Sequence, residues 1–148
     1  MIRLLTGSTH TGKTLLAQRL LERHGAPYLS IDHLKMGLIR SGMCPLTPES
    51  TDEALTAVLW PVVREIVKTA VENGQSLTVE GCYIPFNWRE DFDASCLPHI
   101  RFLCLVFSEA YIRTRFDTIQ THANAIERRK DDSFCTMELL LAENRRNL

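Results

Sequence analysis

A chain of 148 residues with 45% hydrophobic and 24% charged residues is long enough for one globular domain with a full core. Its net charge of −1 at pH 7 disfavours an extended nucleic-acid or membrane surface, and no apolar run approaches a membrane-spanning length. The five cysteines include no C-x-x-C pair, so we expect reduced thiols in a cytoplasmic protein rather than disulfides or a zinc site.

The first predicted element is a short buried strand over residues 2–6, and a helix with apolar residues at helical spacing ends before Gly25. Between them stands G-x-x-x-x-G-K-T, the phosphate-binding P-loop pattern, in the strand-to-helix context that the motif needs. We expect the whole loop to bind a nucleotide. It consists of Gly7, Ser8, Thr9, His10, Thr11, Gly12, Lys13 and Thr14.

Each residue type in this loop suits a polyphosphate. Gly7 and Gly12 allow backbone conformations that a Cβ would forbid, so the N–H groups can turn inward. The helix that follows adds its positive N-terminal end at the same point. We expect Lys13 to contact the β- and γ-phosphates and the Thr14 hydroxyl to bind Mg²⁺.

A second strand is predicted over residues 28–31, followed by a short helix, and this beginning predicts a parallel sheet with helices on both faces. Ligands of such sheets bind beyond the carboxyl ends of the strands, which places Asp32 on the same rim as the P-loop. Asp32 can cap the helix, act as a general base toward an acceptor hydroxyl, or do both.

Cations on the same short helix are candidates for binding an anionic acceptor substrate. Lys35 and Arg40 both lie there, and Arg40 is preferred because a guanidinium matches phosphate or carboxylate in bidentate fashion. The alternative for either residue is an exposed basic face.

The next predicted elements are a long amphipathic helix and a third strand over residues 76–81. A capping box at residues 50–53 begins the helix, and Pro61 should kink it or start a new helix.

Glu80 ends the third predicted strand, where an acid can take part in catalysis at the rim of the sheet and hold Mg²⁺ through water. Gly81 would let substrate or backbone approach closely. The aromatic segment 82–89 could line the acceptor pocket or pack over the sheet.

A fourth strand is predicted over residues 100–107, then a helix from Ser108 through Glu127 and a last helix over residues 135–146. Arg113 and Arg115 lie early in the first of these helices and could neutralise charge on a transferring phosphoryl group. Residues 128–130 form a second basic cluster. The alternative for any one of these arginines is a solvated surface charge.

The P-loop, Asp32, Glu80–Gly81 and the Arg113/Arg115 region together resemble the small-molecule kinases of the P-loop superfamily, such as adenylate, shikimate and gluconate kinases. Residues 28–35 are also similar to the start of polynucleotide-kinase-like and zeta-toxin-like enzymes, in which the corresponding Asp is the base. The resemblance implies a three-layer α/β fold, strand order 2-3-1-4-5, ATP as donor, Mg²⁺, and a lid that closes over the phosphates.

The prediction is therefore a single P-loop kinase-like domain over residues 1–148, with a parallel sheet of four strands, or of five if the family's final strand is present. Its predicted function is ATP-dependent phosphoryl transfer to a small hydroxyl- or phosphate-bearing metabolite. Lys13, Asp32, Glu80 and the two arginines are the catalytic candidates. The alternative is a nucleotide-binding switch or scaffold module without transfer activity. We expect neither a nucleic acid nor a membrane as partner.

Overall fold

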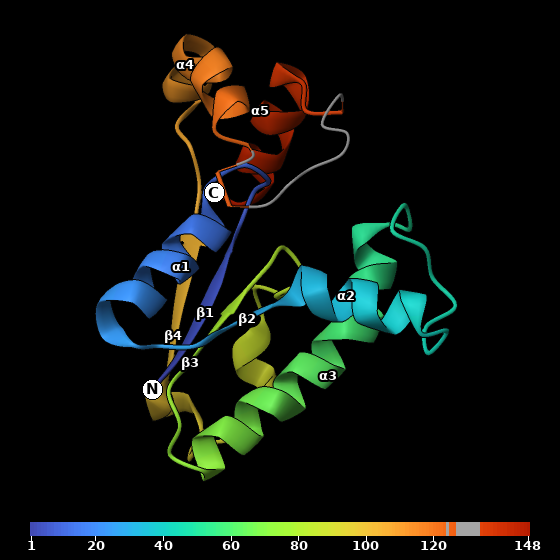
Figure 1. The fold of residues 1–148 in the computed structure, drawn as a ribbon, viewed down its shortest axis with the longest axis vertical. Helices are drawn as coiled ribbons and strands as arrows, with labels where there is room; N and C mark the ends of the chain where they lie inside the picture. The colour runs from blue at the N-terminus through green and yellow to red at the C-terminus, as the bar shows by residue number, and fades with distance from the viewer. Residues whose placement is uncertain (124, 127–133) are drawn as a thin grey trace.

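Four parallel strands form the centre of the molecule in the order β2-β3-β1-β4 (Figure 1). The structure is a computed structural model that describes residues 1–123, 125–126 and 134–148. The strands are β1 (Ile2–Gly7), β2 (Tyr28–Ser30), β3 (Leu77–Glu80) and β4 (Ile100–Leu105). This confirms the predicted α/β class and the predicted order of the first four strands.

The register of the strands brings the predicted functional positions to one rim. Glu80 lies opposite Leu5 of β1 on one side and opposite Ser30 of β2 on the other. The start of the P-loop after β1 and Asp32 after β2 therefore both lie close to the carboxyl end of β3.

Helices cover both faces of the sheet and its carboxyl end. The long helices are α1 (Lys13–His24), α2 (Ile31–Arg40), α3 (Asp52–Glu72), α4 (Glu109–Thr121) and α5 (Met137–Arg146). Two 3₁₀ turns, Trp88–Asp91 and Leu97–His99, precede β4. Figure 1 shows α1 on one side of the sheet, α2 and α3 on the other, and α4 with α5 above the P-loop end. No helix in the described part of the chain has the length and apolar character needed to cross a membrane.

Among the described residues, buried side chains form two separate groups. The larger lies between the sheet and α3 and includes Leu4, Leu59 and Val63, each at most 1% exposed. The smaller joins α4 to α5 through Ile112 and Leu140, both fully buried. The α4–α5 pair is thus a packing unit of its own at the end of the sheet.

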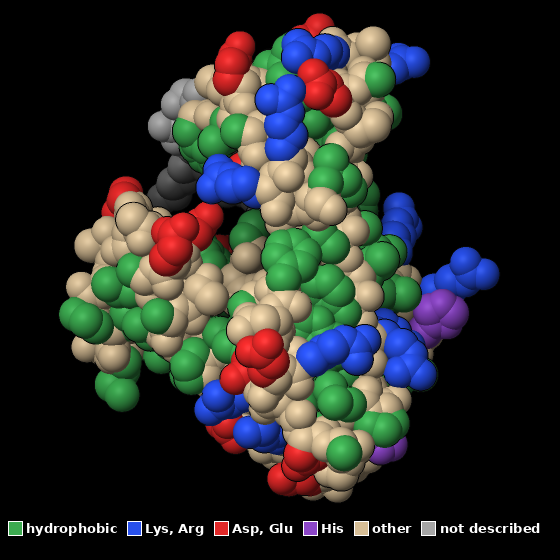
Figure 2. Space-filling view, turned by 180° about the vertical axis from the view of Figure 1, so that it is seen from behind, with side chains coloured by type: hydrophobic (Ala, Val, Ile, Leu, Met, Phe, Trp, Pro, Cys, Tyr) green, Lys and Arg blue, Asp and Glu red, His purple; other side chains and the backbone are tan. Residues whose placement is uncertain are grey.

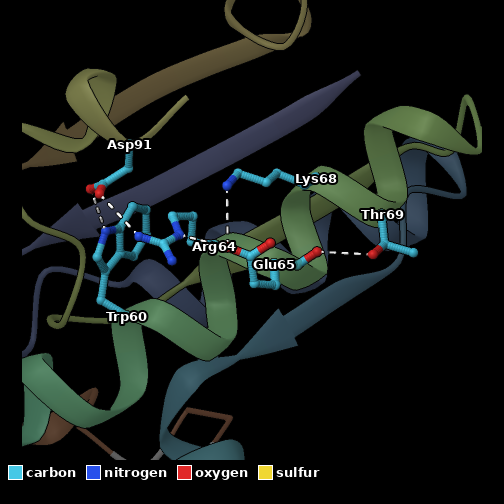
Figure 3. A network of polar contacts seen from close by, with 6 residues as sticks. All are labelled: Trp60, Arg64, Glu65, Lys68, Thr69 and Asp91. Atoms are coloured by element: carbon cyan, nitrogen blue, oxygen red, sulfur yellow. Dashed lines mark hydrogen bonds and ion pairs between the residues drawn. The ribbon is translucent and has the colours of Figure 1, made fainter. Parts of the chain in front are cut away.

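Polar contacts join α3 to the 3₁₀ turn Trp88–Asp91 (Figure 3). The indole N–H of Trp60 donates to Asp91 at 2.8 Å, and Arg64 pairs with the same carboxylate at 3.3 Å. Lys68 and Glu65 form an ion pair of 3.2 Å one turn further along α3. These residues support the core and line none of the cavity beside the P-loop described below.

Several helix boundaries differ from the prediction. Helix α2 begins at Ile31 after an N-cap at Ser30, so Asp32 lies inside the first turn and is not the cap. Thr51, one residue after the predicted Ser50, caps α3 by accepting a hydrogen bond from the Ala54 N–H at 3.3 Å. Helix α3 runs unbroken through Pro61, which excludes a new helix start there.

The later elements are shorter than predicted. Strand β4 ends at Leu105, and α4 is capped by Ser108 as expected but ends at Thr121, with non-helical dihedrals at Arg115. The last helix begins at Met137 because the Thr136 side chain caps it. Residues 124 and 127–133 lie outside the described residues, and with them the predicted basic cluster at 128–130.

Gly7 is required by a close approach of two strands. Its φ is 134°, and a Cβ there would collide with the carbonyl oxygen of Leu105 in β4. We expect Gly7→Ala to lower the free energy of unfolding by about 2–4 kcal/mol, through backbone strain and overpacking. Urea unfolding followed by tryptophan fluorescence measures the change.

Gly37→Ala is the matched control, because Gly37 lies inside α2 and a Cβ there meets nothing within 4 Å. It should leave stability unchanged or raise it by up to about 1 kcal/mol. If Gly7→Ala had the same urea midpoint of unfolding as the wild type, β1 and β4 could move apart to accept a Cβ without a loss of stability.

Candidate active site

Side chains of the P-loop donate hydrogen bonds to carbonyl oxygens of the same loop. Lys13 is 9% exposed, and its Nζ donates to the carbonyl oxygens of Gly7 at 3.0 Å and Ser8 at 2.7 Å. The Thr11 hydroxyl also donates to Ser8 O, at 2.7 Å. Gly12, with φ of 81°, begins α1 in the left-handed region that glycine adopts readily. The backbone curves around the start of α1, as a phosphate-binding loop requires.

His10 has the only positive φ, 61°, among the described residues other than glycine. Its Nδ1 lies 3.6 Å from the Cys135 sulfur, and its ring meets Phe134 edge-on at 6.5 Å between centroids. The P-loop is therefore in contact with the segment that leads into α5. Nothing in the local sequence indicates this contact, because it joins residues 125 positions apart.

An acid and a hydroxyl meet beside the loop. Thr14 Oγ1 lies 3.3 Å from Glu80 Oε2, and Glu80 is 1% exposed. A hydroxyl oxygen and a carboxylate oxygen are ligand types that Mg²⁺ prefers, so the residues present fit the ion that the sequence predicts.

Asp32 joins these side chains in one cavity of about 150 Å³. Lys13, Thr14, Asp32 and Glu80 all line it, so the structure brings together four residues predicted from separate parts of the chain. Its remaining described lining residues are Thr9, His10, Gly12, Leu15, Cys82, His122, Ala123, Ala125 and Ile126. Residues 122–123 and 125–126, which follow α4, thus face the P-loop.

The other predicted substrate-binding residues lie in different surroundings. Lys35 pairs with Asp32 at 2.6 Å. Arg40 is exposed in the last turn of α2, about 12 Å along the helix axis from Asp32, and does not line the cavity. A Cβ on Gly81 would lie 2.9 Å from the Ile31 Cβ. The close approach at Gly81 is therefore to the Ile31 side chain in α2, and Gly81 does not line the cavity.

The two predicted lid arginines do not face the cavity. Arg113 donates to Glu109 with both Nε, at 3.0 Å, and Nη2, at 2.7 Å. Hydrogen bonds from Arg113 and from Arg145 lower the pKa of Glu109. Arg115 is exposed at the bend of α4, and neither arginine lines the cavity. In this conformation both are surface charges.

Helix α5 and its C-cap residue make contacts with the P-loop that the sequence did not predict. Glu143 accepts a hydrogen bond from the Thr9 N–H at 2.9 Å, and Asn147 donates to the Ser8 hydroxyl at 2.9 Å. Glu143 and Asn147 are four residues apart and so share one face of the helix end. The spacing of these two polar residues beside the apolar stripe of the helix was the sequence signal that could have indicated a shared contact.

A second cavity, of about 210 Å³, is lined in part by Ser8, Glu143 and Asn147 of these contacts. It is lined by Asp52 at the start of α3, Phe86 after β3, and Glu143 and Arg146 of α5, among others. Figure 2 shows from behind a hollow between the part that carries α4 and α5 and the part that carries α2. Phe86 is 56% exposed while Trp88 is 3% exposed, so the aromatic segment 82–89 both packs over the sheet and borders a cavity.

Neither a protein-family profile nor a curated protein matches this sequence. Solved structures match the fold. A gluconokinase from Sinorhizobium meliloti 1021 has a TM-score of 0.54 at 19% identity, over 95% of this chain and 71% of that chain. A candidate kinase from Chloroflexus aurantiacus J-10-fl has a TM-score of 0.55 at 23% identity, over 97% and 78%.

A chain of the Pnkp1/Rnl/Hen1 RNA repair complex also matches, with a TM-score of 0.55 at 12% identity, over 99% of this chain and 44% of that chain. At these identities the likenesses concern the fold. They establish that the chain has a P-loop kinase-like fold, as the resemblance in the sequence implies.

Proposed function

We propose that this protein transfers the γ-phosphoryl group of ATP to a hydroxyl- or phosphate-bearing small metabolite. The observation that carries the proposal is the single cavity in which Lys13, Thr14, Asp32 and Glu80 meet beside the P-loop. A phosphate-binding cation, a metal-binding hydroxyl, a buried acid and a partly exposed acid are the groups that phosphoryl transfer needs.

Each residue has a distinct role in this proposal. Lys13 and the N–H groups at the start of α1 bind the β- and γ-phosphates. Asp32, on the rim of the sheet, orients the acceptor hydroxyl and accepts its proton. Residues 122–123 and 125–126, which line the cavity, limit access of water to it, and this favours transfer to the acceptor over hydrolysis.

Thr14 and Glu80 would hold Mg²⁺, Thr14 directly and Glu80 through water. When bound, the ion neutralises charge on the phosphates. The Thr14–Glu80 contact of 3.3 Å supports this pairing, since a carboxylate that is 1% exposed needs a hydrogen-bond donor or a cation nearby.

Glu80→Gln tests that role, because it keeps the size and one acceptor oxygen but removes the charge. We expect the Mg²⁺ concentration for half-maximal activity to rise by about 10–100-fold, as for loss of an outer-shell metal partner. Titration of activity with Mg²⁺ at saturating ATP measures the shift. Glu65→Gln is the control, because Glu65 lies on α3 and does not line the cavity. An unchanged midpoint for Glu80→Gln would remove Glu80 from the metal site.

The direct test of the function is transfer of label from γ-labelled ATP, with Mg²⁺, to a pool of small metabolites. Label in a new organic phosphate would support the proposal and identify the acceptor. Label that stays in ATP, or passes only to free phosphate, would contradict it. That result would favour the alternative of a nucleotide-binding switch or scaffold module.

We also propose a cytoplasmic location. All five cysteines are free thiols, and such chains are typical of a reducing compartment. Fractionation of cells that express the tagged protein would test it.

A further inference from the structure

Lys35 is held between two elements of the fold. Its Nζ lies 2.6 Å from Asp32 Oδ1, three residues earlier in α2, and donates to the Tyr83 hydroxyl at 3.0 Å. The same nitrogen lies 5.1 Å from the centroid of the Tyr83 ring. The Lys35 side chain is 13% exposed and Tyr83 is 6% exposed. The ammonium group therefore has a defined position between α2 and the segment after β3.

The surroundings keep this group charged. Burial alone would lower the pKa of Lys35, but its hydrogen bonds to Asp32 and Tyr83 raise the pKa above its ordinary value. Burial also raises the pKa of Tyr83, so a neutral hydroxyl accepts the lysine N–H. A charged donor to a carboxylate makes a short, strong hydrogen bond, which restricts the orientation of Asp32.

These contacts differ from what an acceptor-binding lysine needs. Two of the three N–H donors of this ammonium group already serve Asp32 and Tyr83, which leaves at most one for a substrate anion. Asp32 has a side chain that is 43% exposed and lines the cavity, whereas Lys35 does not line it. The substrate can therefore reach Asp32 while Lys35 stays behind it.

We propose that Lys35 is a positioning residue for Asp32, supported by Tyr83, and not a ligand of the acceptor. The inference rests on the proposed function. In that reaction the acceptor oxygen forms a bond to the γ-phosphorus, the bond from phosphorus to the β-γ bridging oxygen breaks, and ADP leaves. The proton of the acceptor hydroxyl passes to Asp32, and Lys35 fixes the carboxylate that receives it.

Steady-state kinetics with the acceptor identified by the label assay test the inference. Lys35→Met should lower kcat by about 10–100-fold, the cost of a misplaced catalytic group, and leave the acceptor KM within about threefold. Lys35→Arg should recover part of the loss, because a guanidinium can also pair with Asp32. Tyr83→Phe keeps the ring and should lower kcat by about two- to fivefold.

Lys68→Met is the matched control. Lys68 also pairs with an acid three residues earlier, Glu65, but neither residue lines the P-loop cavity, so its replacement should leave kcat unchanged. Thermal unfolding of every variant separates loss of positioning from loss of the fold.

The double variant Asp32→Asn/Lys35→Met gives the sharpest result. If Lys35 acts through Asp32, the lysine replacement should cost less than about twofold once Asp32 is absent. Additive losses, or an acceptor KM that rises tenfold at unchanged kcat, would overturn the inference while leaving the kinase proposal intact. Absence of transfer by the wild-type protein would overturn both.

Discussion

Replacing Asp32 with asparagine should lower the turnover of phosphoryl transfer by about 10²–10⁴-fold, the range that a positioned general base contributes. Asparagine has nearly the size of aspartate but cannot accept the proton of the acceptor hydroxyl. The side chain lies at the edge of the cavity, and the phosphate-binding groups come from the P-loop, so affinity for Mg-ATP should stay within about threefold of wild type.

Two measurements on the same preparation are needed, turnover with the identified acceptor and Mg-ATP affinity by calorimetry. Asp117→Asn, an exposed position on α4, is the control for the loss of one carboxylate. Loss of turnover with retained affinity would separate a kinase from a binding module, which has no transfer to lose. Full turnover in Asp32→Asn would show that proton removal does not depend on this residue.

The position of Asp32 illustrates what a single sequence can predict. Parallel strands share one carboxyl edge, so a P-loop after β1 and an acid just after β2 had to lie on the same rim. The cap prediction failed by a small margin, because Ile31 is fully buried and begins the helix one residue before Asp32. Sheet topology was thus more predictable than the helix boundary.

The direction of the two arginine side chains, in contrast, could not be predicted from the sequence. Arg113 and Arg115 lie in the predicted helix, but which way each side chain points depends on how α4 packs on α5 and on the bend at Arg115. One signal was available: Glu109 and Arg113 have the i,i+4 spacing of a surface ion pair, and the structure contains that pair.

Contacts of α5 with the P-loop could not be predicted from local patterns. Thr9 and Glu143 are 134 positions apart, and Ser8 and Asn147 are 139 apart. Hydrophobic periodicity predicts that α5 exists and which stripe is apolar, but not which element receives its polar end. As a result, the carboxylate of Glu143 in α5 and the side-chain amide of Asn147 just after it contact the first half of the P-loop.

Lys13→Met should lower turnover by about 10²–10³-fold, the loss expected when one preorganised donor to developing charge is removed. Unlike Asp32→Asn, it should also weaken Mg-ATP binding, because the positive charge that meets the phosphates is gone. Methionine preserves most of the side-chain volume at a position that is 9% exposed. Comparison of kcat, ATP KM and Mg-ATP affinity with those of Lys68→Met measures the effect.

A second consequence distinguishes Lys13 from a lysine that only attracts anions. Its Nζ donates to the carbonyl oxygens of Gly7 and Ser8, so methionine leaves two carbonyl groups of the loop without this donor. Part of the loss should therefore arise from a loop that is less well ordered, and added cations such as ammonium should not restore it. Turnover and affinity close to wild type in Lys13→Met would mean that the P-loop is not the phosphate site. That result would remove the basis of the kinase proposal, since the proposal assigns the β- and γ-phosphates to this loop.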